Sequence, residues 1–134
     1  MISSKHRFHG RNSLRFVLQR GRSVRGQLIT LRYIRNNRQE SYRAAVVVGR
    51  KVNKSAVVRN RIRRRVYEII RKNADRISGP YDLLFSVYGD EIAKMPHPVL
   101  QETVLGLLKR ANVIRNTPET DGKRAIIEQK ENDK

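Results

Sequence analysis

The residues in this sequence best suited to binding chemistry are a run of seven at positions 59–65, Arg-Asn-Arg-Ile-Arg-Arg-Arg. A guanidinium group keeps its charge at physiological pH and donates hydrogen bonds in a planar fork, which matches the oxygen atoms of a phosphate group. Solvated helices usually mix charges of both signs, and a helix face of one sign repels itself unless a polyanion neutralises it. The run therefore predicts a surface that binds a polyanion.

The residues around this run have the spacing of an amphipathic helix. At about 100° per residue, the apolar side chains fall within an arc of about 120°, and they are Val58, Ile62, Val66, Ile69 and Ile70. Arg61 and Arg64 point away from that arc. Asn53 or Ser55 is expected to cap the helix, which should end near Lys72. A folded helix, packed on one side, is thus predicted to hold the guanidinium groups.

The basic part of the chain lacks the residue patterns of the common catalytic sites. A metal-dependent nuclease needs clustered carboxylate or imidazole ligands, whereas residues 1–72 contain only two acids. One of them, Glu68, is expected to pair with Arg64 or Arg65, one helical turn before it. Neither a nucleophilic triad nor a glycine-rich phosphate loop stands out. We therefore expect neither a catalytic residue nor a metal site in this chain.

Charge is distributed unevenly along the 134 residues. The chain contains 30 Lys and Arg against 12 Asp and Glu, a formal charge of +18. Residues 1–72 hold 21 of the basic residues and 2 of the acids, whereas residues 73–134 hold 9 and 10. We expect the first part to contact an anionic polymer and the second to complete the fold. Arginine predominates over lysine, which favours bidentate phosphate contacts and base stacking, and thus RNA.

The composition also restricts the compartment. The sequence has no cysteine, so it has neither a disulfide nor a thiolate metal site, and nothing requires an oxidising environment. The N-terminus lacks the apolar segment of a secretory signal, and no run approaches the roughly 20 apolar residues of a membrane span. A helix adsorbed on a membrane would expose large apolar residues opposite its charges, whereas the Val and Ile residues here look like core. We expect a cytoplasmic protein with no membrane partner and no small-molecule substrate.

The apolar pattern predicts one α+β domain at residues 12–114, between a basic arm at 1–11 and a disordered tail at 115–134. The small apolar run at 42–48 is expected to be a central strand, covered on both faces. Three helices on a small sheet would form a two-layer α/β sandwich. The first expected element is a two-turn helix that begins at Asn12 or Ser13 and ends at Gly21. Strands at 27–34 and 42–48 follow, and then the basic helix. A strand at 81–88 and a helix after Pro98 complete the domain.

Aromatic residues on the strands have two interpretations. Tyr33 and Tyr42 either stack on unpaired bases, as in proteins that bind single-stranded RNA, or pack in the core. Phe16 lies off the apolar stripe of the first helix. It either packs against another element or is an exposed aromatic side chain.

The segment from Arg43 to Arg65 reads Arg-Ala-Ala-Val-Val-Val-Gly-Arg-Lys-Val-Asn-Lys-Ser-Ala-Val-Val-Arg-Asn-Arg-Ile-Arg-Arg-Arg. It strongly resembles the bacterial ribonuclease P protein component, which pairs an Arg-x-Gly-φ-Ser-Val-Ser-Lys-Lys strand and turn with an Ala-Val-x-Arg-Asn-Arg-φ-Lys-Arg helix, the RNR motif. The similarity covers roughly residues 7–112, and the RNR block is its specific part. The matching residues are Arg43, Lys51, Ala56, Arg59, Asn60, Arg61, Ile62, Arg63 and Arg64.

The resemblance implies the small subunit of a ribonucleoprotein that removes the 5′ leader from precursor tRNA, with catalysis by a large RNA subunit that binds most of the magnesium ions. It also implies a left-handed crossover around the RNR helix, against the usual right-handed rule. The implied contacts with the catalytic RNA are Arg50, Lys51, Lys54, Arg59, Asn60, Arg61, Arg63, Arg64 and Arg65. The implied cleft for the single-stranded leader, between the first helix and the sheet, would be lined by Leu14, Phe16, Leu18, Tyr33 and Arg43.

The chain departs from the family pattern at three places. The family has aromatic residues on the cleft side of its first helix, where this chain has Leu14 and Leu18. The strand tyrosine of the family aligns with Arg32 or with Tyr33. The turn at 47–51 keeps its charge but loses two hydroxyl groups. The alternative function is that of a ribosomal or other structural RNA-binding protein without a role in cleavage.

Overall fold

The structure of this protein is a computed structural model that describes residue 6 and residues 11–114, with side chains at residue 6 and from residue 14 onward. Apart from His6 and Arg11, the expected arm lies outside the described residues, and so does the expected tail at 115–134. The elements in chain order are α1 (Arg11–Arg20), β1 (Arg22–Arg25), β2 (Ile29–Arg35), β3 (Arg43–Val48), α2 (Ala56–Lys72), the 3-10 helix η2 (Ala74–Arg76), β4 (Tyr81–Val87), the 3-10 helix η3 (Asp90–Ala93) and α3 (His97–Arg110).

The four strands form one mixed sheet in the order β1-β2-β4-β3. The pairs β1–β2 and β2–β4 are antiparallel, and β3 and β4 are parallel. Because parallel strands need a crossover connection, α2 passes over the sheet between β3 and β4. The predicted α+β class is confirmed, whereas the left-handed sense of the crossover stays a prediction.

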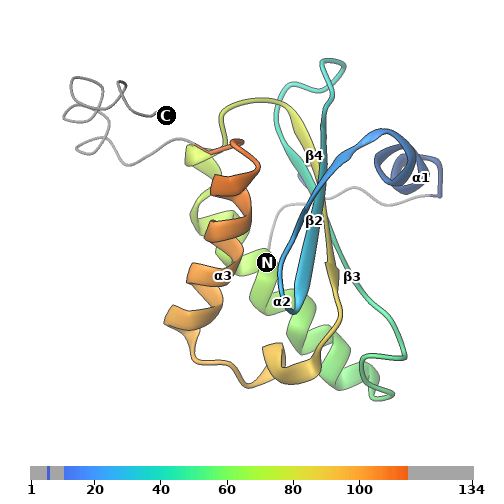
Figure 1. Ribbon diagram of the computed structural model, residues 1–134, viewed down its shortest axis with the longest axis vertical. Coiled ribbons are helices and arrows are strands. Elements are labelled where there is room, and N and C mark those ends of the chain that lie inside the picture. Colours follow the sequence, from blue (N-terminus) through green and yellow to red (C-terminus); the bar gives the residue numbers. More distant parts are fainter. Residues whose placement is uncertain (1–5, 7–10, 115–134) are drawn as a thin grey trace.

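The core lies on the face of the sheet that α2 and α3 cover, which we call the core face (Figure 1). The strand residues that point to it are Ile29, Leu31, Ala44, Val46, Val48, Leu83, Phe85 and Val87. They pack against Ile62, Val66, Ile69 and Ile70 of α2 and against Leu100, Val104, Leu107 and Leu108 of α3. Burial of each large aliphatic side chain contributes roughly 1.5–3 kcal/mol. The apolar stripes predicted for both helices are confirmed.

The helix α1 lies on the opposite face, which we call the α1 face (Figure 1). Val17 of α1 packs against Ala45 and Leu84, and Leu14 and Ile34 are partly buried beside them. This small cluster covers only part of the α1 face. Further along the same face Val47 and Tyr88 are exposed, Arg32 and Ser86 are half-buried and Thr30 is buried. This region has no helix over it and is available to a partner.

Two expectations about the sheet were wrong. The strand β3 lies at an edge and not in the centre. Its apolar run is buried except for Val47, which is 44% exposed, because α2 covers one face and the Val17 cluster covers only Ala45 on the other. The hydroxyl of Tyr67 also accepts a hydrogen bond from the Val46 N–H at 3.1 Å, which protects this edge. In addition, the edge strand β1 was missed, because its residues Arg-Ser-Val-Arg show no apolar alternation.

The membrane question has a direct structural answer within residues 11–114. None of the helices described there has both the length and the apolar character needed to cross a bilayer.

Tyr42 is a buried residue, only 4% exposed, and its ring stacks on that of His6 with the centroids 4.3 Å apart. It therefore packs in the fold and does not offer a free face to a base. Burial raises the pKa of Tyr42 to about 12, although the nearby Arg71 acts in the opposite direction.

We predict that Tyr42 causes part of the alkaline unfolding of this protein. The unfolded chain releases the phenol proton near pH 10 and the folded chain retains it to about pH 12, so the folded state loses stability between these values and loses none below them. Tyr42→Phe should remove this loss. Urea unfolding at pH 9 and pH 11.5 should show a smaller fall in the free energy of unfolding for the variant, and an equal fall would contradict the prediction.

Candidate nucleic-acid interface

The start of α2 is fixed by several hydrogen bonds. Ser55 is the N-cap, and its side-chain oxygen accepts a hydrogen bond from the Val58 N–H at 3.3 Å. The side-chain oxygen of Asn53 accepts one from the Ser55 N–H at 2.8 Å. The guanidinium of Arg59 reaches back to the carbonyl oxygens of Asn53 and Lys54, at 2.9 Å each. Ser55 is thus the cap, and Asn53 and Arg59 hold the preceding loop against the helix.

Arg61 and Arg64 are the two arginines of the run that remain available for a partner. Both are exposed, and neither makes a hydrogen bond or ion pair with another part of the described chain. They are three residues apart, so they lie side by side on the helix surface. We call this pair the basic face of α2. Both residues lie opposite to the apolar stripe, as the sequence predicts.

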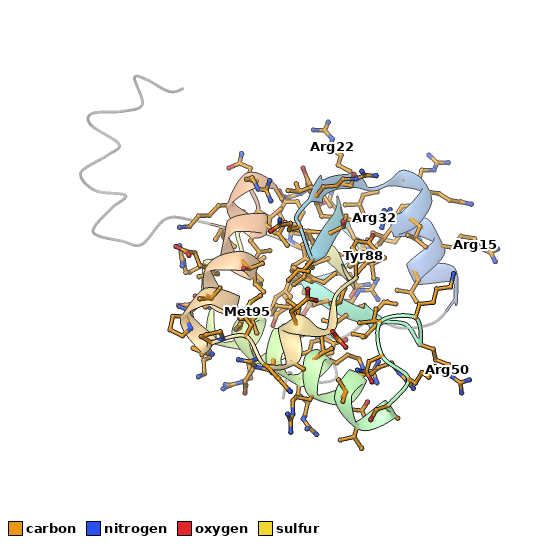
Figure 2. All side chains as sticks on the ribbon, turned by 60° about the horizontal axis from the view of Figure 1, so that its bottom comes forward. Arg15, Arg22, Arg32, Arg50, Tyr88 and Met95 are labelled. Carbon is orange, nitrogen blue, oxygen red and sulfur yellow. The ribbon has the colours of Figure 1, made fainter. Side chains whose placement is uncertain are left out.

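Other basic residues before α2 are exposed as well. Arg50, Lys51 and Lys54 occupy the loop between β3 and α2. Figure 2 shows Arg50 projecting outward from this loop. Together with the basic face of α2, these three residues present cations to solvent within one short segment of the sequence.

The remaining members of the run have partners inside the protein. Arg63 donates a hydrogen bond to the side chain of Asn60. Arg65 is half-buried and donates to the carbonyl oxygens of Ile92 and Met95, at 2.6 Å each. Arg65 therefore joins α2 to the segment that leads into α3, a structural role that the sequence did not indicate.

The acid on α2 is also engaged. Glu68 forms an ion pair with Arg71, one turn after it, with 2.7 Å between the nitrogen and the oxygen. The hydrogen bond from Arg71 lowers the pKa of Glu68 below its usual value. The pair seen here thus extends toward the C-terminal end of α2, whereas the sequence analysis expected partners one turn earlier. Within the described residues, no group of three or more His, Cys, Asp and Glu comes together as a metal site.

The residues expected to line a leader cleft are divided between the two faces of the sheet. Leu14 lies on the α1 face beside the Val17 cluster. Leu18, one turn further along α1, is 52% exposed, and Phe16 is 45% exposed. Tyr33 lies on the core face, because it pairs with Leu83 across the β2–β4 ladder. Tyr33 therefore lies on the other side of the sheet from Leu14, and it shares a pocket only with Arg20, the last residue of α1.

Arg43 lies on the α1 face, but it is held by an internal partner. Its guanidinium donates two hydrogen bonds to the carboxylate of Asp82, at 3.0 and 2.9 Å. Asp82 is 1% exposed and also accepts a hydrogen bond from Asn36 at 3.0 Å. A buried carboxylate is costly unless it is paired, so Arg43 stabilises the fold at this position.

One aromatic residue on the α1 face was missed as a candidate. Tyr88 follows β4 and is 56% exposed. A side-chain hydrogen bond with Thr30 lowers the pKa of its phenol, and the nearby Arg32 and Arg25 act in the same direction. Figure 2 shows Tyr88 and Arg32 next to each other. The signal was present in the sequence, because strand alternation places Tyr88 on the same side as Leu84.

The fold and these surfaces define a small basic α+β protein that presents cations on one helix and an uncovered sheet face on another side. The family model described as Ribonuclease P matches residues 2–112. The chain belongs to this family.

Curated relatives carry the same description. The ribonuclease P protein component of Chloroflexus aggregans is 36% identical over 107 residues, which are 80% of this chain and 77% of the relative. That of Brevibacillus brevis is 29% identical over 119 residues, which are 89% of this chain and 93% of the relative.

Solved structures share the fold. The RNase P protein of Staphylococcus aureus superposes with a TM-score of 0.73 at 21% identity, over 82% of this chain and 98% of that one, a likeness that concerns the fold alone. The RNase P protein of Thermotoga maritima gives a TM-score of 0.69 at 25% identity, over 78% of this chain and 96% of that one.

The division of the arginines into two groups leads to a testable prediction. Arg61→Ala combined with Arg64→Ala should flatten the plot of log affinity for RNA against log salt by about one to two units, because two phosphate contacts are lost. The free energy of unfolding should stay within about 0.5 kcal/mol of the original protein.

Arg65→Ala is the matched control, from the same run of the same helix. It should lower the free energy of unfolding by about 1.5–3 kcal/mol, since its guanidinium makes two internal hydrogen bonds, and should leave the salt slope unchanged. Filter binding over a salt series and urea unfolding measure the two quantities. The division would be contradicted if the double variant retained the original slope while Arg65→Ala reduced it.

Proposed function

We propose that this chain is the protein subunit of a ribonuclease P holoenzyme that removes the 5′ leader of precursor tRNA. In this proposal it binds the catalytic RNA and the single-stranded leader, and thereby promotes endonucleolytic cleavage that produces the mature 5′ end of tRNA. Family membership supports the proposal. The observation that carries it is the basic face of α2, because Arg61 and Arg64 lie within the RNR segment and have no partner in the described chain.

The catalytic RNA would bind at the basic face of α2 and the loop before it. A rigid helix fixes the positions of its guanidinium groups before binding, so little conformational entropy is lost when they contact phosphates. Arginine suits this role because its fork binds two phosphate oxygens at once. The hydrogen bonds at the start of α2 contribute to this rigidity, because they fix the residue at which the helix begins.

The single-stranded leader would lie on the uncovered part of the α1 face. Tyr88 offers an exposed ring for base stacking, and Arg32 and Arg25 lie close enough to affect its pKa. Proteins that bind single strands combine such rings with cations along the backbone path. In this proposal Tyr88 supplies stacking that Leu14 and Leu18 cannot supply, while Leu18 adds an apolar contact.

The RNA subunit would carry out catalysis and would bind most of the magnesium ions. The holoenzyme would act in the cytoplasm. When bound, magnesium supplies a nucleophilic water and stabilises charge on the phosphate. The protein residues would bind and position the RNA. Arg61 and Arg64 would neutralise RNA phosphates and so reduce the magnesium concentration that the folded RNA requires.

Reconstitution tests the proposal directly. The purified chain, mixed with the catalytic RNA of the same organism at low magnesium, should raise the rate of leader cleavage by at least about tenfold over the RNA alone. The chain without RNA should not cleave. A structural RNA-binding protein would bind the RNA without raising cleavage, so RNA binding with an unchanged rate would refute the proposal.

The leader contact can be tested in the same system. Tyr88→Ala should weaken binding of leader-bearing precursor tRNA to the holoenzyme by about fivefold or more, because base stacking is worth about 1–3 kcal/mol. Binding of leaderless tRNA should be unchanged. Val99→Ala serves as the control, since Val99 is an exposed apolar residue of α3, on the other side of the sheet from Tyr88. Equal losses for both variants, or for both tRNAs, would show that Tyr88 does not contact the leader.

A further inference from the structure

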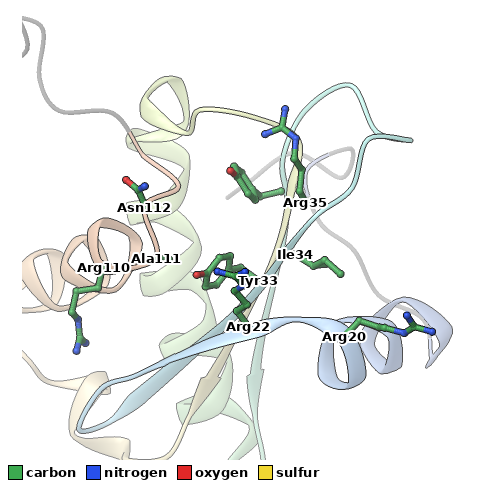
Figure 3. A pocket seen from close by; sticks show the side chains of 9 residues that line it. Arg20, Arg22, Tyr33, Ile34, Arg35, Arg110, Ala111 and Asn112 are labelled. Atoms are coloured by element: carbon green, nitrogen blue, oxygen red, sulfur yellow. The ribbon is translucent and has the colours of Figure 1, made fainter. Parts of the chain in front are cut away.

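A pocket of about 510 Å³ lies at one end of the sheet, bordered by the C-terminal ends of α1 and α3. Four of its lining residues are arginines and two are tyrosines, and none is acidic. Figure 3 shows it between the C-terminal end of α3 and the neighbouring strands β1 and β2. The residues that line it are Arg20, Arg22, Tyr33, Ile34, Arg35, Tyr81, Arg110, Ala111 and Asn112.

The sheet register places cations and rings alternately on one surface. Tyr33 is paired with Arg22 across β1 and β2, and Arg35 is paired with Tyr81 across β2 and β4. Tyr33 and Arg35 are two residues apart on β2, so all four side chains lie on the core face. They lie beyond the buried core residues, toward the end of the sheet. Cross-strand neighbours are about 5 Å apart, which gives two adjacent pairs of one cation and one ring.

The two pairs differ in which of their side chains a ligand can contact. The guanidinium of Arg35 lies over the ring of Tyr81, 5.5 Å from its centroid, so that ring already has a partner. Tyr33 is only partly buried and extends from β2 toward the end of α3, with Arg22 beside it (Figure 3). Arg20 and Arg110 point away from Tyr33 in the same view, and Arg110 donates a hydrogen bond to the carbonyl oxygen of Arg25. The Nε–H of Arg35 donates a hydrogen bond to the side-chain oxygen of Asn37 at 3.0 Å, which leaves its terminal nitrogens for a ligand. The groups that a ligand can contact are thus Tyr33, Arg22 and the terminal nitrogens of Arg35.

The charge of the pocket favours an anionic ligand with a flat ring. Arg22 and Arg35 are exposed and face a pocket without a carboxylate to balance them. A phosphate group would relieve their mutual repulsion and accept hydrogen bonds from both. A nucleobase matches the face of a tyrosine ring. A nucleotide unit combines both features.

Tyr33, Arg22 and Arg35 lie apart from the two surfaces described above, although Arg20 of α1 and Ile34 also line the pocket. Ile34, between Tyr33 and Arg35, points to the α1 face and packs near Val17. Tyr88 and Arg32 therefore lie on the other side of the sheet. The C-terminal end of α3, which borders the pocket, is at the opposite end of the molecule from the start of α2 (Figure 1).

We propose that this pocket binds one nucleotide of a single-stranded RNA segment, with the base against Tyr33 and the phosphate at Arg22 and Arg35. It is a third RNA contact, additional to the basic face of α2 and to the α1 face. The proposal rests on the proposed function only for the identity of the polymer. A protein with contacts on both sides of its sheet would hold two RNA segments at a fixed distance from each other.

Photocrosslinking tests this site on the full chain. The probe is a 5′-phosphorylated decauridylate with one 4-thiouridine, irradiated with the protein at low salt. Trypsin cleaves after Arg32 and Arg35, so Tyr33 lies in a peptide separate from Arg32 and from Tyr88. Mass spectrometry should find crosslinks in the peptide that contains Tyr33; the peptide of residues 77–94 contains both Tyr81 and Tyr88 and does not distinguish the two sides of the sheet.

A pair of double variants separates the pocket from general attraction by charge. Arg22→Ala with Arg35→Ala should reduce the yield of this crosslink about tenfold. Arg38→Ala with Lys109→Ala removes the same charge from exposed residues outside the pocket and should change the yield less than twofold. Thermal unfolding shows that each variant is folded.

Two results would overturn the proposal. One is an original protein with no crosslink in the Tyr33 peptide, its crosslinks all lying on α1, on α2 or in the peptide of residues 77–94. This result needs no variant. The other is an equal loss of crosslinking in the two double variants. Neither result affects the reconstitution assay, because that assay measures leader cleavage. Conversely, a crosslink at Tyr33 together with unchanged cleavage would support this site and refute the proposed function.

Discussion

The packing of one side of α2 against the sheet is the constraint on which the basic surface depends. Ile62, Val66 and Ile70 are fully buried under the core face, so the helix cannot rotate about its axis without exposing them. Because the helix repeat is 3.6 residues, this fixes Arg61 and Arg64 on the solvent side. A free peptide of this sequence would lose helicity through the repulsion of its arginines. The apolar core therefore supplies the free energy that keeps like charges together.

Arginine has two distinct roles in this fold, and only the contacts distinguish them. Arg43 neutralises the buried Asp82, and Arg65 binds two carbonyl oxygens near the start of α3. Those guanidinium groups exchange water for internal partners and stabilise the folded chain. Arg61 and Arg64 keep their hydration until a partner replaces it. A high net charge is tolerated here because part of it is used internally and the rest is separated on the surface.

The sequence predicted those features that depend on periodicity. The apolar stripes of α2 and α3 and the two faces of β4 followed from spacing alone, and the cap was narrowed to Asn53 or Ser55, of which Ser55 is the cap. Features that depend on which segments meet in space did not. The edge position of β3 needed the order of the strands, since helices on both faces produce the same apolar run as a central position. The partners of Arg43 and Arg65 lie 39 and about 30 residues away, beyond the reach of local patterns. Tyr33 was ambiguous because one residue of register decides its face.

The central claim is that α2 is a preformed helix whose Arg61 and Arg64 contact RNA phosphates. Nuclear magnetic resonance of the full chain, with and without the catalytic RNA, tests it most directly. We expect helical backbone shifts for residues 56–72 in the free protein, and RNA-induced shifts of the side-chain Nε–H signals of Arg61 and Arg64 that exceed those of Arg65. A free protein without helical shifts in this segment, or RNA-induced changes that leave both signals in place, would contradict it.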